Sequence, residues 1–145
     1  MARIKIDLPG KFSFSTNIPI RITDINFGGH VGNDTILSII HEARAKFFQH
    51  LGYDELNFGG FGTIMSDVAI EYKDQIYYGD EVFASVAVGE ITKVAFDLFY
   101  KLEKKSVNGK QSTVALAKTW MVCYDYDKKK VAAIPGAAIK KITSQ

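Results

Sequence analysis

The sequence predicts an α+β fold, in which one long helix packs on an antiparallel sheet of five or six strands. Two observations carry this prediction. One segment near residue 40 has apolar residues three and four positions apart, as a helix requires, whereas nearly everything after residue 62 is rich in Val, Ile, Phe, Tyr and Thr and is broken by short turns. Such a sheet needs a cover for its apolar face, and only one helix is long enough to provide it.

The predicted helix spans Asn33–Leu51, which is about five turns. Asn33 is the expected N-cap, Asp34 places negative charge at the positive end of the helix dipole, and Gly52 provides a left-handed stop. Both sides of this helix carry apolar residues, so we expect a strongly curved sheet to enclose it. The residues on the helical period are Ile36, Ile39, Ile40, Ala43, Phe47, Phe48 and Leu51.

Five segments have the composition of strands, and a sixth is weaker. Pro19 marks an edge or a bulge in the first of them, because proline has no N–H to give to a neighbouring strand. Asn108-Gly109 predicts a hairpin turn between two others. The predicted strands are Phe12–Ile22, Thr63–Tyr72, Glu81–Glu90, Val94–Lys104 and Ser112–Tyr126, with the weaker one at Ala137–Ile142.

Composition narrows the class of protein. A chain of 145 residues with 47% apolar residues has the size and the core of a single domain over residues 1–145. The net charge of +2 is spread along the chain, so we expect no nucleic-acid partner. Cys123 is the sole cysteine, and we find neither a signal peptide nor an apolar run long enough to span a bilayer. We therefore expect a cytoplasmic protein without membrane contact.

A motif before and inside the predicted helix points to a family. The segment Arg21–Asn33, with its Gly-Gly-His-Val-Gly run, is followed by Glu42-Ala43-Arg44, and together they resemble the signature of the hotdog 4-hydroxybenzoyl-CoA thioesterase-like superfamily. In that family a strand ends in Asp-x-Asp, Gly-His-Val-Asn-Asn opens a central helix, and Glu-Ala-Arg follows. The resemblance covers about residues 14–126 and implies the hotdog fold, a sheet wrapped around one central helix.

The same resemblance implies hydrolysis of an acyl thioester, carried by coenzyme A or by acyl carrier protein, at a subunit interface of a homodimer or homotetramer. It implies no metal and no cofactor. Substrate binding falls on Gly29, Val31, Asn33 and Asp34, because free N–H groups at a helix start can polarise the thioester carbonyl.

The sequence departs from the family pattern at Asn26, where the family has its catalytic Asp, and an amide cannot act as a general base. Three interpretations follow. Asp24 or Glu42 supplies the carboxylate while Asn26 and His30 orient water or the carbonyl. Alternatively, Asp24-x-Asn26 with His30 performs hydratase chemistry on an enoyl-CoA, although His30 follows one residue later than in the hotdog hydratases. In the third, the protein binds an acyl thioester without turning it over.

Each of these residues also has a structural explanation. Asp24 can cap the end of its strand, and His30 can hold a tight turn through a backbone carbonyl. Glu42 lies in a helix that we expect to be buried on most sides, so it is either a catalytic base or half of an ion pair. Phe61 and Met65 either line an acyl pocket or pack in the core.

Overall fold

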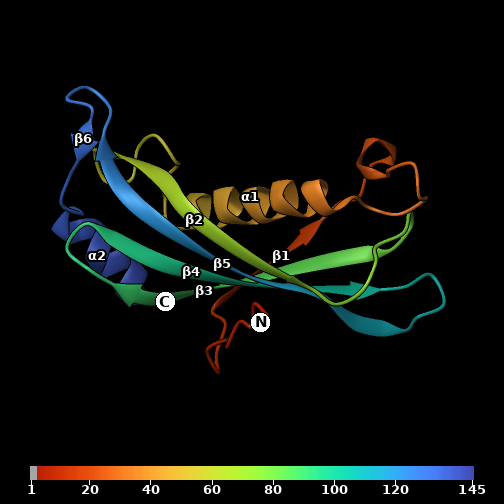
Figure 1. The fold of residues 1–145 in the computed structure, drawn as a ribbon. Helices are drawn as coiled ribbons and strands as arrows, with labels where there is room; N and C mark the ends of the chain where they lie inside the picture. Colours follow the sequence, from red (N-terminus) through yellow and green to blue (C-terminus); the bar gives the residue numbers. More distant parts are fainter. Residues whose placement is uncertain (1–2) are drawn as a thin grey trace.

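The structure is a computed structural model that describes residues 3–145 (Figure 1). Strand β1 and a 3-10 turn precede the long helix α1, four long strands follow it, and a short strand and a short helix close the chain. In chain order the elements are β1 (Phe14–Ile18), the turn (Ile22–Asp24), α1 (Asn33–His50), β2 (Gly62–Tyr72), β3 (Glu81–Ile91), β4 (Ala95–Lys105), β5 (Gln111–Asp125), β6 (Lys130–Val131) and α2 (Gly136–Thr143).

All strands belong to one antiparallel sheet of six strands, which confirms the predicted α+β class. Five strands lie in the order β1-β3-β4-β5-β2, and β6 pairs with β5 beyond this path. The hairpin predicted at Asn108-Gly109 joins β4 to β5, whose register runs to Lys105 opposite Gln111. The two ends of the order are the edges β1 and β2, and β1 stops at Ile18, immediately before Pro19.

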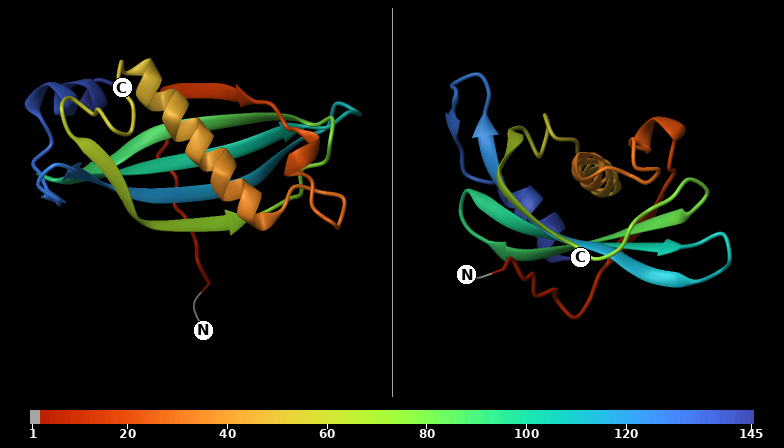
Figure 2. Two further views of the ribbon diagram at one scale, coloured as in Figure 1. Left: turned by 90° about the horizontal axis from the view of Figure 1, so that it is seen from above. Right: turned by 45° about the vertical axis from the view of Figure 1, so that its right-hand side comes forward.

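The sheet twists and curves, and α1 lies along its concave side (Figure 2). The helix buries one face against the sheet, and the largest contacts are made by rings near its C-terminal end. The Phe48 ring lies 4.9 Å from the ring of Phe58 and 6.3 Å from that of Phe96 on β4, measured between ring centres. These side chains are fully buried and form the centre of the core.

Three predictions about elements are wrong. Residues 137–142 form α2 instead of a strand, because Ala138 and Ile142 are one helical turn apart and both are buried. Gly32 is the N-cap of α1 in place of Asn33. The sheet encloses only one side of α1, so that Leu37 remains 37% exposed. Among residues 3–145, no helix combines the length and the apolar character needed to cross a membrane.

Candidate active site

A glycine-rich loop, residues 25–32, leads from the 3-10 turn into α1 and is held by the side chain and backbone of Asn26. The Asn26 Oδ1 atom accepts a hydrogen bond of 2.9 Å from the Gly28 N–H, and the Asn26 N–H donates to the His30 carbonyl at 2.8 Å. Gly29 has a φ of +85°, which a residue with a side chain rarely adopts. Asn26 is therefore committed to shaping this loop, with only its NH₂ group free to reach outward.

The segment between β2 and β3 anchors the loop against the sheet. The Val31 N–H donates to the Ile76 carbonyl at 2.8 Å, and the Tyr72 hydroxyl donates to the Asn33 carbonyl at 3.0 Å. Beneath this segment the buried Lys104 ammonium lies 3.5 Å from an Asp80 carboxylate oxygen and also contacts the Gln75 carbonyl. The helix start is thus tied to a fixed part of the sheet.

The His30 imidazole has one nitrogen engaged and one free. Its Nδ1 atom lies 3.0 Å from the Val31 carbonyl oxygen, and because a carbonyl can only accept, Nδ1 carries the proton in the neutral ring. Nε2 is then an acceptor, and it faces the backbone of Gly28. The Tyr77 ring meets the imidazole edge-on, with ring centres 6.4 Å apart. The predicted turn-holding role of His30 is therefore present in the structure.

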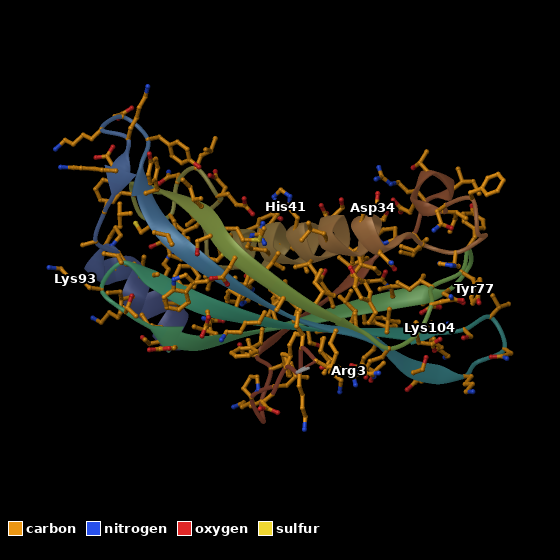
Figure 3. All side chains as sticks on the ribbon, in the orientation of Figure 1. Arg3, Asp34, His41, Tyr77, Lys93 and Lys104 are labelled. Atoms are coloured by element: carbon orange, nitrogen blue, oxygen red, sulfur yellow. The ribbon has the colours of Figure 1, made fainter. Side chains whose placement is uncertain are left out.

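At the start of α1 three backbone N–H groups point away from the helix without an acceptor among residues 3–145. The first helical hydrogen bond runs from the Ile36 N–H to the Gly32 carbonyl at 3.2 Å, which leaves Asn33, Asp34 and Thr35 as free donors. A Cβ on Gly32 would come within 2.6 Å of the Asp34 Oδ1 atom, so Gly32 lets this carboxylate fold back toward the loop. Figure 3 shows Asp34 at the exposed start of α1.

Two predicted carboxylates, Asp24 and Glu42, meet in one hollow of about 380 Å³ between α1 and the segment that follows β1. We call it the carboxylate hollow, and Thr35 and Ser38 also line it from α1. Thr35, Ser38 and Glu42 recur three and four positions apart, so they form a polar stripe along one face of the helix. Its lining residues are Ile18, Pro19, Arg21, Asp24, Thr35, Ser38, Ile39 and Glu42.

The two carboxylates are held differently. Asp24 Oδ2 accepts the Arg21 N–H at 2.8 Å, and Oδ1 lies 3.7 Å from the Arg21 guanidinium. Asp24 thus closes the 3-10 turn and does not cap the end of its strand, because β1 already ends at Ile18. Glu42 is 55% exposed and meets only the Lys46 ammonium at 3.8 Å. The prediction that Glu42 is buried is wrong for this chain, because the sheet leaves that side of α1 open.

A second hollow of about 230 Å³ opens on the other side of the helix start. His30, Val31 and Asn33 line it together with the stretch 72–76 between β2 and β3. The free donors at the start of α1 therefore lie between two hollows, since Thr35 borders the first and Asn33 the second. Of the predicted binding residues, Val31 and Asn33 face this second hollow.

Phe61 and Met65 lie elsewhere, next to the C-terminal half of α1. Phe61 packs against the core, and the Met65 sulfur lies 4.0 Å from the guanidinium of Arg44. Neither residue borders either of these two hollows. Within one chain, both residues therefore contribute to packing.

Arg44 forms a second polar cluster, buried under the middle of α1. Its guanidinium donates to Glu55 at 2.8 Å and to the Tyr100 hydroxyl at 3.5 Å, and that hydroxyl lies 2.9 Å from the Thr119 hydroxyl. Burial alone would lower the pKa of Arg44, but Tyr100 and Glu55 raise it above its ordinary value. Burial also raises the pKa of Tyr100, so the phenol remains neutral beside the guanidinium. The motif arginine thus pairs within its own chain.

The sequence prediction missed Thr35, Ser38 and Arg21. The first two could have been found from their helical spacing to Glu42, whereas Arg21 acts through a local turn that the sequence reads as a strand. Among residues 3–145, no three His, Cys, Asp or Glu side chains converge closely enough to hold a metal ion.

Comparisons with known proteins agree with this geometry. Residues 20–142 match the family model of the thioesterase-like superfamily. The 4-hydroxybenzoyl-CoA thioesterase of Pseudomonas is similar in structure, with a TM-score of 0.81 and 16% identity over 90% of this chain and 99% of the other. An Asp-to-Asn variant of 4-hydroxybenzoyl-CoA thioesterase in complex with 4-hydroxybenzoyl-CoA has a TM-score of 0.78 and 17% identity over 89% and 97% of the two chains.

A thioesterase of Thermus thermophilus, complexed with coenzyme A and zinc, has a TM-score of 0.78 and 24% identity over 94% of this chain and 96% of the other. At these identities the likeness establishes the fold alone. No curated protein matches the chain in sequence. The matched family model spans most of the chain, and the structural neighbours are hotdog thioesterases. The chain therefore belongs to the thioesterase-like superfamily and has the hotdog fold.

Proposed function

We propose that this chain hydrolyses an acyl thioester, carried by coenzyme A or acyl carrier protein, to a free acid and a thiol. The single observation that carries the proposal is the carboxylate hollow. Asp24 and Glu42 come from different parts of the chain, yet both line this hollow, which runs along the first half of α1. Membership of the thioesterase-like superfamily supports the same reaction.

The start of α1 is the natural place for the thioester carbonyl. The N–H groups of Asn33, Asp34 and Thr35 are free donors, and the helix dipole adds positive potential where negative charge develops on the carbonyl oxygen. Water attacks the carbonyl carbon, the C–S bond breaks, and the departing thiolate takes up a proton to become the thiol. The helix start then serves as the oxyanion site.

Glu42 is the carboxylate that we assign as general base. Asp24 has both oxygens turned toward Arg21, whereas Glu42 has only one distant ammonium partner. Glu42 also points into the hollow from the helix that carries the oxyanion donors, and helical side chains lean toward the helix start. Glu42 takes a proton from the attacking water, and Asp24 positions the segment that faces it.

Asn26 and His30 have orienting roles in this scheme. The Asn26 NH₂ group lies on the side of the loop near Gly32, where it can donate to the substrate. The His30 Nε2 atom is the unprotonated nitrogen of the ring because Nδ1 donates to Val31, so it can accept a hydrogen bond from water or from the thiol that leaves. Gly29 and Val31 keep the backbone of this loop in place.

Assembly into a homodimer, which can pair further into a homotetramer, fits the exposed parts of the structure. Strand β2 has 11 residues and lies at the sheet edge, so its outer backbone groups can pair with a second copy. The side of α1 that faces away from the sheet is exposed as well, so a second copy that also covered this side would shield the carboxylate hollow from water. Phe61 and Met65 would contact acyl groups only in such an assembly. We also propose a cytoplasmic location and a single domain, consistent with the buried, unpaired Cys123.

The test is thiol release from a panel of aliphatic and aromatic acyl-CoAs. We expect Glu42→Gln to lower kcat by ~100-fold or more, which is the usual size of a general-base contribution, and Asp24→Asn to lower it by about 10-fold. Glu103→Gln is the matched control, since Glu103 is another surface carboxylate near a single lysine, Lys101, and should leave kcat unchanged. Absence of thiol release from every substrate would refute hydrolysis, and hydration of an enoyl-CoA under those conditions would favour the hydratase alternative.

A second candidate function is binding of an acyl thioester without turnover, and Asn26 favours it. An Asp-to-Asn variant of a structural neighbour holds 4-hydroxybenzoyl-CoA, so a protein of this fold with such a substitution can still bind a thioester. Asn26→Asp separates the two functions. If Glu42 is the base, Asn26→Asp changes kcat by less than about 3-fold. If the protein has no base, Asn26→Asp restores one, and the rate of hydrolysis rises at least ~100-fold.

A further inference from the structure

The convex face of the sheet, opposite α1, carries a hollow of about 250 Å³ that the proposed reaction does not use. On β4 the buried Phe96 and Leu98 face the core, so Asp97 between them faces the other side. Asp97 pairs across the sheet with Trp120 on β5, and Trp120 pairs with Asp67 on β2. We call this the outer hollow, and Asp67, Glu90, Asp97, Lys118 and Trp120 line it.

Asp97 is the unusual residue of the outer hollow. It is only 5% exposed, and its Oδ1 atom has no hydrogen-bond donor among residues 3–145. The other oxygen lies 3.6 Å from the Lys118 ammonium, which is longer than a good ionic hydrogen bond. Burial raises the pKa of Asp97, Lys118 offsets part of this rise, and Glu90 and Asp67 add smaller increases. A buried acceptor in this state is stabilised by an added donor.

Glu71 on β2, two strands away from β4, is a carboxylate on the same face of the sheet whose two oxygens both have partners. One Glu71 oxygen lies 2.9 Å from the Lys73 ammonium, and the other accepts the Ile6 N–H at 3.1 Å. The segment before β1 thus supplies Glu71 with a donor, and Figure 1 shows this segment passing beneath the convex side of the sheet. No corresponding donor reaches Asp97 Oδ1 from the part of the chain that the structure describes.

The outer hollow has an excess of negative charge, which favours binding of a cation. Three carboxylates face one ammonium, and Lys118 also lies over the Phe99 ring at 5.6 Å, so it is shared between two partners. Adjacent strands lie ~4.8 Å apart, so acids on β2, β3 and β4 are spread by roughly 14 Å across the sheet, too far to converge on one metal ion. Trp120 adds an indole face, which attracts ammonium groups.

We propose that the outer hollow binds an extended organic polycation of the linear diamine or polyamine class. One ammonium group donates to Asp97 Oδ1 beside the Trp120 indole, and a second reaches either Glu90 on the adjacent β3 or Asp67 on β2, beyond β5. A linear cation matches carboxylates laid out in a row, and its alkyl chain can lie on the exposed part of the indole. This site lies on the face of the sheet away from the carboxylate hollow.

Trp120 provides a direct readout, because it is the only tryptophan of the chain. The experiment titrates the full-length protein at fixed ionic strength with spermidine, 1,4-diaminobutane and butylamine while its fluorescence is recorded. We expect a saturable change with spermidine, a weaker one with the diamine and none with the monoamine. A change that fails to saturate, or that sodium chloride reproduces, would overturn the proposal.

Three variants make the test specific. Asp97→Asn should weaken spermidine binding at least 10-fold, and Glu103→Gln, on the same face but outside the outer hollow, should leave it unchanged. Lys118→Met removes the resident ammonium and should tighten binding. Unchanged spermidine affinity in Asp97→Asn would refute the site. A change of oligomeric state in any of these variants, without a change in spermidine binding, would also refute it, because the outer hollow would then be an interface between copies.

Discussion

The two ends of α1 differ more than any other parts of this helix. At its start Asp34 is exposed, three backbone donors are free, and two hollows open beside the loop. Near its end Phe47 and Phe48 are fully buried among other rings, and one turn before them Arg44 is paired with Glu55 beneath the helix. The helix is therefore anchored at one end and available for binding at the other. Mutations at its two ends should separate stability from activity.

The largest effect should come from Phe48→Ala at the buried end. The side chain is fully buried against the rings of Phe58 and Phe96, so its removal leaves a cavity that these rings cannot fill. We expect the free energy of unfolding to fall by about 3–5 kcal/mol, measured by urea denaturation. Gln49→Ala, one residue later and exposed, is the control. Equal stability of the two variants would show that this end of α1 is not the anchor.

Glu55→Gln should have the next largest effect. It removes the negative partner of the buried Arg44. Because the Glu55 side chain is 28% exposed, solvent screens part of this interaction and reduces the loss of stability. The expected destabilisation is about 1–3 kcal/mol. The matching change at the exposed pair, Glu42→Gln, should stay within ~0.5 kcal/mol because Lys46 and Glu42 are both exposed to water. Thermal unfolding of both proteins tests this ranking, and the reverse order would contradict it.

Gly52→Ala should cost about 1 kcal/mol of stability. Gly52 directly follows Leu51, the C-cap of α1, and has a φ of +84°, a conformation in which a Cβ is strained. The change tests the anchored end through the backbone alone, since no core side chain is removed. Activity measured at a temperature well below unfolding should be unchanged, and a selective loss of kcat would mean that the two ends of α1 are coupled.

The smallest change in stability should come from Gly32→Ala at the open end. Gly32 has an ordinary φ of −69°, but the new methyl group would displace the Asp34 carboxylate, which is exposed and free to rotate. We expect less than ~0.5 kcal/mol of change in the free energy of unfolding, as for most surface substitutions. The substrate KM should nevertheless rise several-fold, because the loop beside the helix donors is disturbed. Unaltered kinetics would place substrate binding elsewhere.

Much of this fold could be predicted from the sequence because its signals are periodic. The helical period of α1 and the β-rich segments after residue 62 identify both layers, and Gly52 marks the helix end. The segment 137–142 was assigned wrongly because a short run of Ala and Ile suits either a strand or a helix, and only packing against the core decides. The N-cap was misplaced by one residue, which is the usual uncertainty of helix boundaries.

The site could be predicted only in part. The sequence motif predicts a site at the loop before α1, but the shared hollow of Asp24 and Glu42 depends on the path of the chain after β1, where the strand is short and a turn follows. The exposure of Glu42 depends on how far the sheet curves, and no local pattern encodes that. The role of Asp97 could not be predicted for a similar reason. Whether a single acid in an apolar strand keeps an unpaired oxygen depends on the side chains of all the neighbouring strands.

Arg44 has a consequence beyond its own stability. A smooth apolar helix can slide by one turn, about 5.4 Å, along an apolar sheet and keep most of its contacts. Such a slip would break the hydrogen bonds of the Arg44 guanidinium to Glu55 and Tyr100. It would leave a buried charge without a partner, which is strongly unfavourable. The pairing of the buried arginine therefore fixes the position of α1 along its axis. The same pairing thus fixes where Glu42, two residues earlier on the helix, lies along the axis.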